Sequence, residues 1–217
     1  MALDPAVKAV VARKLEEYEG RYPHLYLDTK GKVTVGVGHM IPNRDAIALV
    51  PFYLRSSESD SESSSGSDSG DPGTPATTAQ KQQEYDRVHA QKRNYRAAWY
   101  QQLCKLVMSD TDIDAQRDRH ITVFYQELRI IYRQANGYPL DFDQMPAVAQ
   151  LALFDMIFNL GATKLQKLFV KFNAALKEGD WIRAGEESNR PDVSPRRNSY
   201  VKQLFDNAHQ LTSNTTS

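Results

Sequence analysis

Cysteine is nearly absent from this sequence, since Cys104 is the only one among 217 residues. The chain can therefore form no internal disulfide, and a zinc site built from cysteines would need ligands that it lacks. Cys104 stands in an apolar helical pattern, where a small core side chain is the expected role. Long apolar runs are also absent, and charged residues stand where a signal peptide would have its apolar segment. The sequence thus predicts no membrane partner and no export by the general pathway.

A net charge is absent too, because 27 basic residues balance 27 acidic ones. Five of the acids lie in residues 56–80, which contain no Lys, Arg, aromatic or branched aliphatic residue. Leaving these five out gives the rest of the chain 27 basic and 22 acidic residues, a net of +5 that suits an anionic polymer such as a cell wall. The tract itself has too little apolar surface to offset an ordering entropy of about 1–2 kcal/mol per residue. We expect a disordered loop or linker at 56–80.

A helix is predicted from Asp4 to Glu19. Asp4 can cap it, Pro5 suits the first helical position, and Gly20 can adopt the left-handed conformation that ends a helix. Glu19 then lies in the last turn, where the partial negative charge of the helix end disfavours an ionised carboxylate. Taken without the segment that follows, Glu16, Glu17 and Glu19 are better explained as an ordinary solvated run.

A β-hairpin is predicted directly after this helix. Residues 33–38 read Val-Thr-Val-Gly-Val-Gly, which places the valines on one face and Thr34, Gly36 and Gly38 on the other. Two glycines on one face indicate that another group approaches the backbone closely, and we take Gly38 as a candidate substrate contact. The turn at residues 29–31 folds Asp28 back towards Thr34. We expect Asp28 and Thr34 to share an open polar surface, with Glu19 facing it across the loop.

Two carboxylates in different environments are the minimum that glycoside hydrolysis requires. One protonates the departing glycosidic oxygen, while the other orients a water molecule or stabilises positive charge on the sugar. Residues 19–39 have the order Glu-Gly, then Tyr-x-Asp-x-x-Gly-x-x-Thr-x-Gly-x-Gly-His. This order resembles the active-site signature of the T-even phage lysozymes, glycoside hydrolase family 24.

The resemblance implies a muramidase that hydrolyses the β-1,4 bond between N-acetylmuramic acid and N-acetylglucosamine in bacterial peptidoglycan. Glu19 would be the general acid. Asp28 and Thr34 would position the attacking water on the opposite face of the sugar ring, as an inverting mechanism requires. No cofactor is implied.

Helical periodicity dominates the sequence after residue 80. Caps and breaks divide it into separate helices, with Ser109 or Asp110 as one break and Gly179 with Asp180 as another. The predicted helices are Lys81 to Leu106, Thr111 to Gln134, Met145 to Leu160 with Asp143 as its cap, Thr163 to Lys177, Trp181 to Glu187, and a last helix opened by Ser194 and Pro195.

No metal site is predicted. Asp110, Asp112 and Asp114 have the spacing of a calcium loop. However, Ala115 stands where such a loop has its glycine, and Ile121 stands where it has its bidentate glutamate.

The resemblance extends to two features of the helical half. Phe158 and Asn159 precede Leu160-Gly161 in a turn like the one that lines the saccharide cleft in this family, so both would contact substrate. Arg197 follows Ser194 and Pro195 as the family's arginine does, and would pair with Glu19. Without the resemblance, Phe158 is equally compatible with a core position, and Arg196 and Arg197 with a solvated pair at a helix start.

The expected architecture is a single α+β, lysozyme-like domain over residues 1–217, with a cleft between two lobes. Its parts would be a helix and hairpin lobe at 5–55, the insertion at 56–80 and a helical lobe at 81–210. The resemblance departs between about residues 40 and 135. We expect a monomer that acts on peptidoglycan and binds no nucleic acid.

Three other functions stay open at this stage: a lytic transglycosylase, a chitinase, and a cell-wall-binding module without turnover. The protein would be made in the cytoplasm without a signal peptide and would act in the periplasm or cell wall of a bacterium. It could be a phage endolysin or the toxic domain of a bacteriocin or secretion effector, and the unusual middle favours the effector. A toxin would need a cognate immunity protein in the producing cell.

Overall fold

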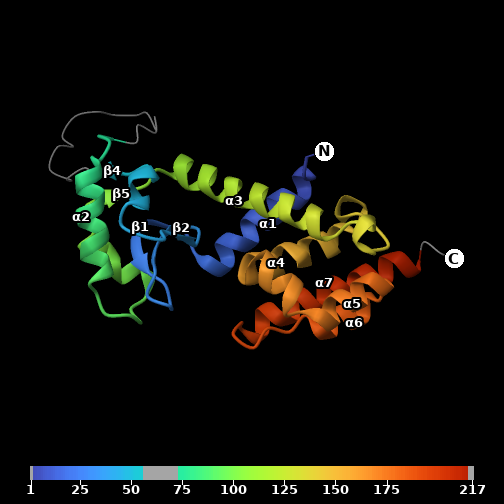
Figure 1. Cartoon of the computed structure of the whole chain (residues 1–217). Helices are drawn as coiled ribbons and strands as arrows, with labels where there is room; N and C mark the ends of the chain where they lie inside the picture. The colour runs from blue at the N-terminus through green and yellow to red at the C-terminus, as the bar shows by residue number, and fades with distance from the viewer. Residues whose placement is uncertain (1, 56–72, 215–217) are drawn as a thin grey trace, which may run out of the picture. The chain divides into compact units, whose positions relative to one another are not determined.

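The chain is mostly helical and carries two small antiparallel sheets (Figure 1). A computed structural model describes residues 2–55 and 73–214. The content of helices and small sheets is compatible with the expected α+β class. Most of the tract predicted to be disordered lies outside the described residues. Its last part is ordered, however, because Thr77 and Gln80 form a reciprocal capping box that starts a helix at Thr78.

The described residues fall into two compact units, and the division runs through two helices, α1 (Pro5–Glu19) and α3 (Asp110–Ile131). The described residues within 16–118 form one unit, which we call the hairpin unit. Residues 2–15 and 119–214 form the other, the helical unit. The helical lobe expected at 81–210 is therefore shared between the two units.

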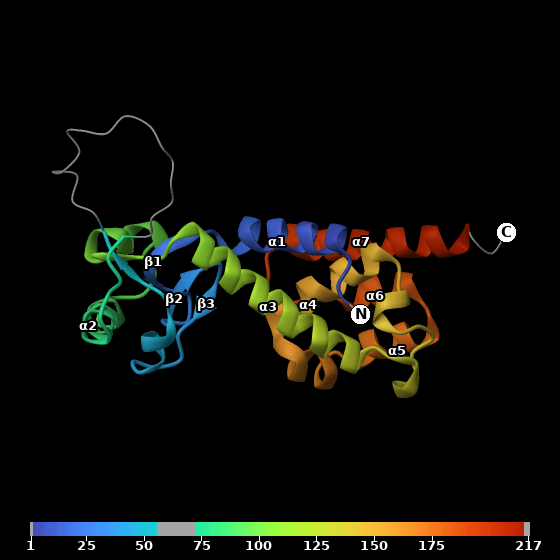
Figure 2. The same cartoon turned by 90° about the horizontal axis from the view of Figure 1, so that it is seen from above.

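The main sheet of the hairpin unit has three antiparallel strands in the order β1-β2-β3, which Figure 2 shows side by side. Tyr26 lies opposite Thr34 and Leu27 opposite Val33. The prediction of a helix ending at Glu19 and followed by a hairpin is confirmed. The strands are β1 (Tyr22–Leu27), β2 (Val33–Gly36) and β3 (His39–Met40).

The single long helix predicted from Lys81 to Leu106 is wrong. Glu84 shows why, since its buried carboxylate accepts hydrogen bonds from the backbone amides of Lys105 (2.6 Å) and Leu106 (3.2 Å). Such long-range bonds leave no periodic signal in a sequence. The segment comprises α2 (Thr78–His89), the 3-10 helix η3 (Ala97–Leu103) and β5 (Leu106–Val107), which pairs with β4 (Tyr53–Leu54); a further 3-10 helix, η1, spans Ala46–Leu49.

The helical unit is built on four helices in which each packs on the next in chain order, and the last also packs on the first (Figure 1). Its core is apolar and aromatic, with Leu153, Phe172 and Phe205 fully buried. None of the helices in the described ranges is both long and apolar enough to cross a membrane. The helices are α4 (Ala147–Lys167), α5 (Val170–Glu178), α6 (Trp181–Glu187) and α7 (Pro195–Ser213), preceded by the 3-10 turns η4 (Gln134–Asn136) and η5 (Phe142–Gln144).

Two of the helix boundaries predicted in this unit are confirmed. Asp180 caps α6 by accepting a hydrogen bond from the backbone amide of Arg183, at 3.0 Å. Ser194 caps α7, with Pro195 at its first position. These signals are local, so no tertiary contact had to be known to read them.

Two other boundaries are wrong. Asp143 caps no helix, because its carboxylate pairs with Arg129 at 2.9 Å and accepts a hydrogen bond from the hydroxyl of Tyr125 at 2.8 Å. The helix predicted from Met145 starts at Ala147. Its predicted end at Gly161 is confirmed, because Gly161 has a non-helical φ of 72° and ψ of 159°, and a second helical segment runs from there to Lys167. The next helix, predicted to start at Thr163, is interrupted before Val170.

Candidate active site

The end of α1 places Glu19 in the hairpin unit. Gly20 adopts a φ of +77°, and a Cβ at this position would lie 2.5 Å from the ring of Tyr22, so both the backbone and the space require glycine. One turn earlier, Glu16 forms ion pairs with Arg21, at 3.0 Å, and with Arg117 of α3. These pairs hold the helix end that carries Glu19.

Glu19 lies against the backbone of Gly38. Gly38 occupies the turn between β2 and β3 with a φ of +68°, and a Cβ there would lie 3.4 Å from Cβ and Cγ of Glu19 and 3.5 Å from its Oε2. At Gly36, the corresponding neighbour is Oε1 of Gln116, at 2.7 Å. The two glycines predicted that another group approaches the backbone closely. The groups that do so are the side chains of Gln116, at Gly36, and of the candidate acid Glu19, at Gly38.

Asp28 stands directly after β1 and organises the turn to β2. Its Oδ1 accepts hydrogen bonds from the backbone amides of Lys30 (2.8 Å) and Lys32 (2.7 Å). Its backbone amide donates to the carbonyl of Lys32, at 2.9 Å. The carboxylate is half-buried and fixed in direction, and Oδ2 accepts no hydrogen bond from the described residues. The oxygen Oδ2 is the one that can orient a water molecule.

Thr34 lies on the strand face towards which Asp28 is directed. The prediction that this face is open to solvent at Thr34 is wrong. Thr34 pairs with Tyr26. Asp28 follows directly after β1, two residues beyond Tyr26, so the alternation of side chains along the strand directs Asp28 towards the face of Tyr26 and Thr34. Thr34 is only 3% exposed, however, and its hydroxyl donates to the carbonyl of Lys32 at 3.0 Å. With its proton engaged, Oγ1 can act only as an acceptor towards a water molecule.

Tyr26 interacts electrostatically with both candidate carboxylates. Burial raises the pKa of its phenol well above the ordinary value, and the charges of Glu19 and Asp28 raise the pKa further. Tyr26 therefore lies within electrostatic reach of both acids and keeps its proton. Its ring meets that of Tyr22 edge to face, with centroids 5.1 Å apart. Sequence reasoning assigned no role to Tyr26, although it is the tyrosine of the quoted Tyr-x-Asp motif.

Gln116 is a second residue that sequence reasoning missed. It is 5% exposed, and its Oε1 has no hydrogen-bond partner among the described residues. This oxygen points at Gly36, next to the turn that holds Gly38. Nothing in the sequence signals this position, because Gln116 lies 80 residues from the hairpin on α3.

The three residues carried over from the helical half belong to the helical unit. Arg197 is 7% exposed, and its Nε donates to Oδ2 of Asp155 at 2.9 Å. Phe158 is half-buried and meets Phe124 edge to face, with centroids 5.6 Å apart. Asn159 is exposed. Pairing of Arg197 with Glu19 and contact of Phe158 and Asn159 with saccharide stay predictions.

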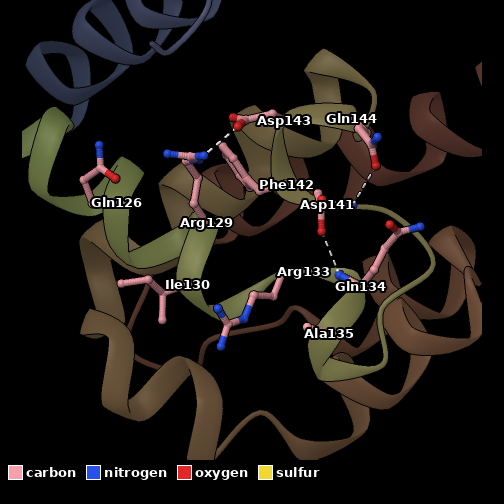
Figure 3. Close-up of a pocket in the computed structure, with 10 residues that line it drawn as sticks. All are labelled: Gln126, Arg129, Ile130, Arg133, Gln134, Ala135, Asp141, Phe142, Asp143 and Gln144. Carbon is pink, nitrogen blue, oxygen red and sulfur yellow. Dashed lines mark hydrogen bonds and ion pairs between the residues drawn. The ribbon is translucent and has the colours of Figure 1, made fainter. Parts of the chain in front are cut away.

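A hollow of about 710 Å³ lies elsewhere in the helical unit, and none of the predicted site residues lines it (Figure 3). Arg129 and Asp143 lie next to each other at its edge and form the ion pair described above. Within residues 2–55 and 73–214, no group of three or more His, Cys, Asp or Glu side chains is arranged to hold a metal ion. The chemistry that the candidate site offers is that of two carboxylates, a hydroxyl and a phenol.

On the expectation that Glu19 is a general acid, Gly38→Ala should lower glycoside hydrolysis by about 10–100-fold, because even a small displacement of a catalytic group is costly. The new methyl group would press on Glu19 and would occupy an unfavourable backbone conformation. Gly137→Ala is the matched control, since Gly137 has a φ of +84° but no neighbour closer than the amine of Lys177, at 3.9 Å. Equal losses of activity per folded molecule in the two variants would contradict a role for Gly38 in placing Glu19.

A scan against protein-family models found none that matches this chain, and a search of curated proteins found no similar sequence.

Proposed function

We propose that this protein is a peptidoglycan hydrolase of the muramidase type with a lysozyme-like fold. The observation that carries the proposal is that the charges of Glu19 and Asp28 both act on the buried phenol of Tyr26 within the hairpin unit, where Glu19 lies against Gly38. Both acids and Thr34 come from the motif that resembles the T-even phage lysozymes. A side-chain set of this kind serves acid-base cleavage of a glycosidic bond.

In the proposed reaction, Glu19 gives its proton to the glycosidic oxygen as the bond to the sugar carbon breaks. A water molecule attacks that carbon from the opposite face of the ring and loses a proton to Asp28. Oδ1 of Asp28 is held by the amides of Lys30 and Lys32, which leaves Oδ2 to accept the proton. Oγ1 of Thr34 accepts a hydrogen bond from the second O–H of the water, because its own hydroxyl donates to the carbonyl of Lys32.

The helical unit would supply the remaining contacts. Phe158 and Asn159 would form part of a saccharide-binding wall, and Arg197 would pair with Glu19. The substrate would be the wall of a target bacterium, reached by release or secretion. A producing cell would then need an immunity protein against its own enzyme.

The test is the identity of the products that the wild-type chain releases from purified peptidoglycan sacculi. Mass spectrometry should find soluble muropeptides that end in a reducing N-acetylmuramic acid. Anhydro products would assign a lytic transglycosylase instead, cleavage of chitin oligomers a chitinase, and binding without release a wall-binding module. Each of these three results would contradict the proposal.

The stereochemistry of the fresh product tests the mechanism. An inverting hydrolysis of a β bond gives the α-anomer first, which proton NMR detects before mutarotation. A β-anomer would indicate a retaining route through Asp28, with the two carboxyl groups only about 5 Å apart.

A further inference from the structure

A basic segment without acids lies beside the hairpin. No Asp or Glu occurs between Asp86 and Asp110, while this stretch carries five Lys and Arg residues. Lys92, Arg93 and Arg96 are exposed and form no ion pair with the described residues. Since these cations are unneutralised by the described chain, the segment suits an anionic ligand.

An aromatic pair occupies the middle of this segment. Tyr95 stacks on Trp99 with ring centroids 4.0 Å apart and planes 17° apart. Trp99 in turn meets the fully buried Tyr100 edge to face, at 5.2 Å, and the hydroxyl of Tyr100 donates to the carbonyl of Lys92. Tyr95 is nevertheless 44% exposed. Its outer ring face is thus a supported platform that is open to solvent.

The segment is joined to the hairpin that carries Asp28. A Cβ at Gly31 would lie 2.9 Å from Nε of Arg93, so the guanidinium lies over the tip of the turn that Asp28 organises. η3 starts four residues after Arg93 and packs on β1, and Nε2 of His24 donates to the carbonyl of Ala97 at 3.0 Å. The aromatic pair and the candidate catalytic turn therefore belong to one packed unit.

The backbone between Arg93 and Tyr95 has an unusual conformation. Asn94 has a φ of 76° and is the only residue other than glycine with a positive φ in the described ranges. This conformation costs free energy and persists where the surroundings hold it, which is common at binding sites. Here it accompanies a basic side chain on one side and the aromatic platform on the other.

We propose that Arg93, Tyr95, Arg96 and Trp99, with Lys92, form a peptidoglycan-binding subsite outside the cleavage site; we call this set the aromatic-basic surface. The proposal deepens the proposed function and rests on it. The slightly positive C–H face of a pyranose ring packs on the negative face of Tyr95. The arginines bind the carboxylates of the lactyl-linked stem peptides, for which a guanidinium offers paired donors.

Peptidoglycan fits this surface better than a nucleic acid does. Single-stranded nucleic acids are bound by several aromatic side chains that stack successive bases along a basic groove. The aromatic-basic surface offers one exposed ring face, supported from beneath by Trp99. Its junction with the Asp28 turn also places it where a polymer cut at that turn would continue.

The test is co-sedimentation of the full chain, carrying Glu19→Gln to prevent cleavage, with peptidoglycan sacculi. Tyr95→Ser should weaken binding by about three- to tenfold, while Tyr95→Phe keeps the ring and should bind as the parent does. Arg93→Ser combined with Arg96→Ser should weaken binding by a similar factor at low salt and by less at high salt. The matched control for charge is Lys164→Ser combined with Lys171→Ser, two exposed positions of the helical unit.

A second substrate separates the two halves of the surface. Glycan strands from which an amidase has removed the stem peptides should still require Tyr95 and should no longer respond to the arginine substitutions. Unchanged sedimentation of both variants with sacculi, or tighter and variant-sensitive binding of a single-stranded oligonucleotide, would overturn the proposal. Turnover is measured separately with the wild-type chain. If that chain releases no product while the substitutions above still weaken binding, the result refutes the hydrolase and retains the binding surface.

Discussion

Asp28→Asn should reduce muropeptide release by about 10²–10⁴-fold while leaving the hairpin folded, a loss typical of a missing acid or base catalyst. The substitution separates the two roles of this side chain. An asparagine Oδ1 can still accept the hydrogen bonds from the amides of Lys30 and Lys32, so the turn is retained. An amide NH₂ group takes the place of Oδ2, and this group cannot accept a proton from water.

Asp28→Ala is the companion variant, because it removes the acceptor of both turn hydrogen bonds as well as the charge. It should lose as much activity and also about 1–2 kcal/mol of stability, at about 1 kcal/mol for each net hydrogen bond. Activity is read as reducing ends released from sacculi, and stability from urea unfolding. An asparagine variant with more than a tenth of wild-type activity would remove Asp28 from the mechanism.

Asp155→Ala should destabilise the helical unit by about 3–5 kcal/mol, the usual cost of removing one partner from a buried ion pair. Asp155 of α4 is 6% exposed and lies between two buried arginines. Oδ1 lies 2.7 Å from Nη1 of Arg190, and Oδ2 lies 2.9 Å from Nε of Arg197. Without the carboxylate, both guanidinium groups would lose an ion-pair partner in a region of low dielectric.

Each unit contains one of the chain's two tryptophans, which makes this loss measurable. In a Trp99→Phe background, the fluorescence of the buried Trp181 reports unfolding of the helical unit alone. Asp206→Ala is the control, because Asp206 pairs with Lys202 in a partly exposed i,i+4 bridge of α7 and should contribute less than 1 kcal/mol. If Asp155→Ala cost no more than this control, the buried cluster would have no structural role.

Local signals predicted the parts of the fold that local chemistry decides. Gly20 ends α1, Asp180 starts α6, and Ser194 with Pro195 starts α7, each as the sequence indicates. A capping side chain or a left-handed glycine acts within a few residues, so its effect can be read without knowledge of distant contacts.

Tertiary contacts decided what the sequence could not predict. Tyr95 and Trp99 have helical spacing, yet Trp99 lies in a 3-10 helix and packs on both Tyr95 and Tyr100, and Glu84 fixes the strand that follows. Asp143 looked like a cap, but Arg129 and Tyr125 occupy its carboxylate. In each case a partner distant in sequence outweighed the local preference.

The candidate site was predictable to the extent that one motif contains it. Glu19, Asp28 and Thr34 were identified from residues 19–39. The register pairs Thr34 with Tyr26, and Asp28 follows directly after β1, two residues beyond Tyr26. The burial of Thr34 and the position of Tyr26 depend on the packed sheet. Gln116 depends on the docking of α3 against Gly36, which no local pattern records.

The central claim is that Glu19 is the acid of a muramidase. The most direct test compares the wild-type chain with Glu19→Gln and measures the reducing ends that each releases from purified sacculi. Glu17→Gln, the same change at an exposed position two residues earlier on α1, is the matched control. The account predicts reducing-end muropeptides from the wild type and the control, and a loss of at least about 10²-fold for Glu19→Gln. Equal release by all three chains, or no release by any, would contradict it.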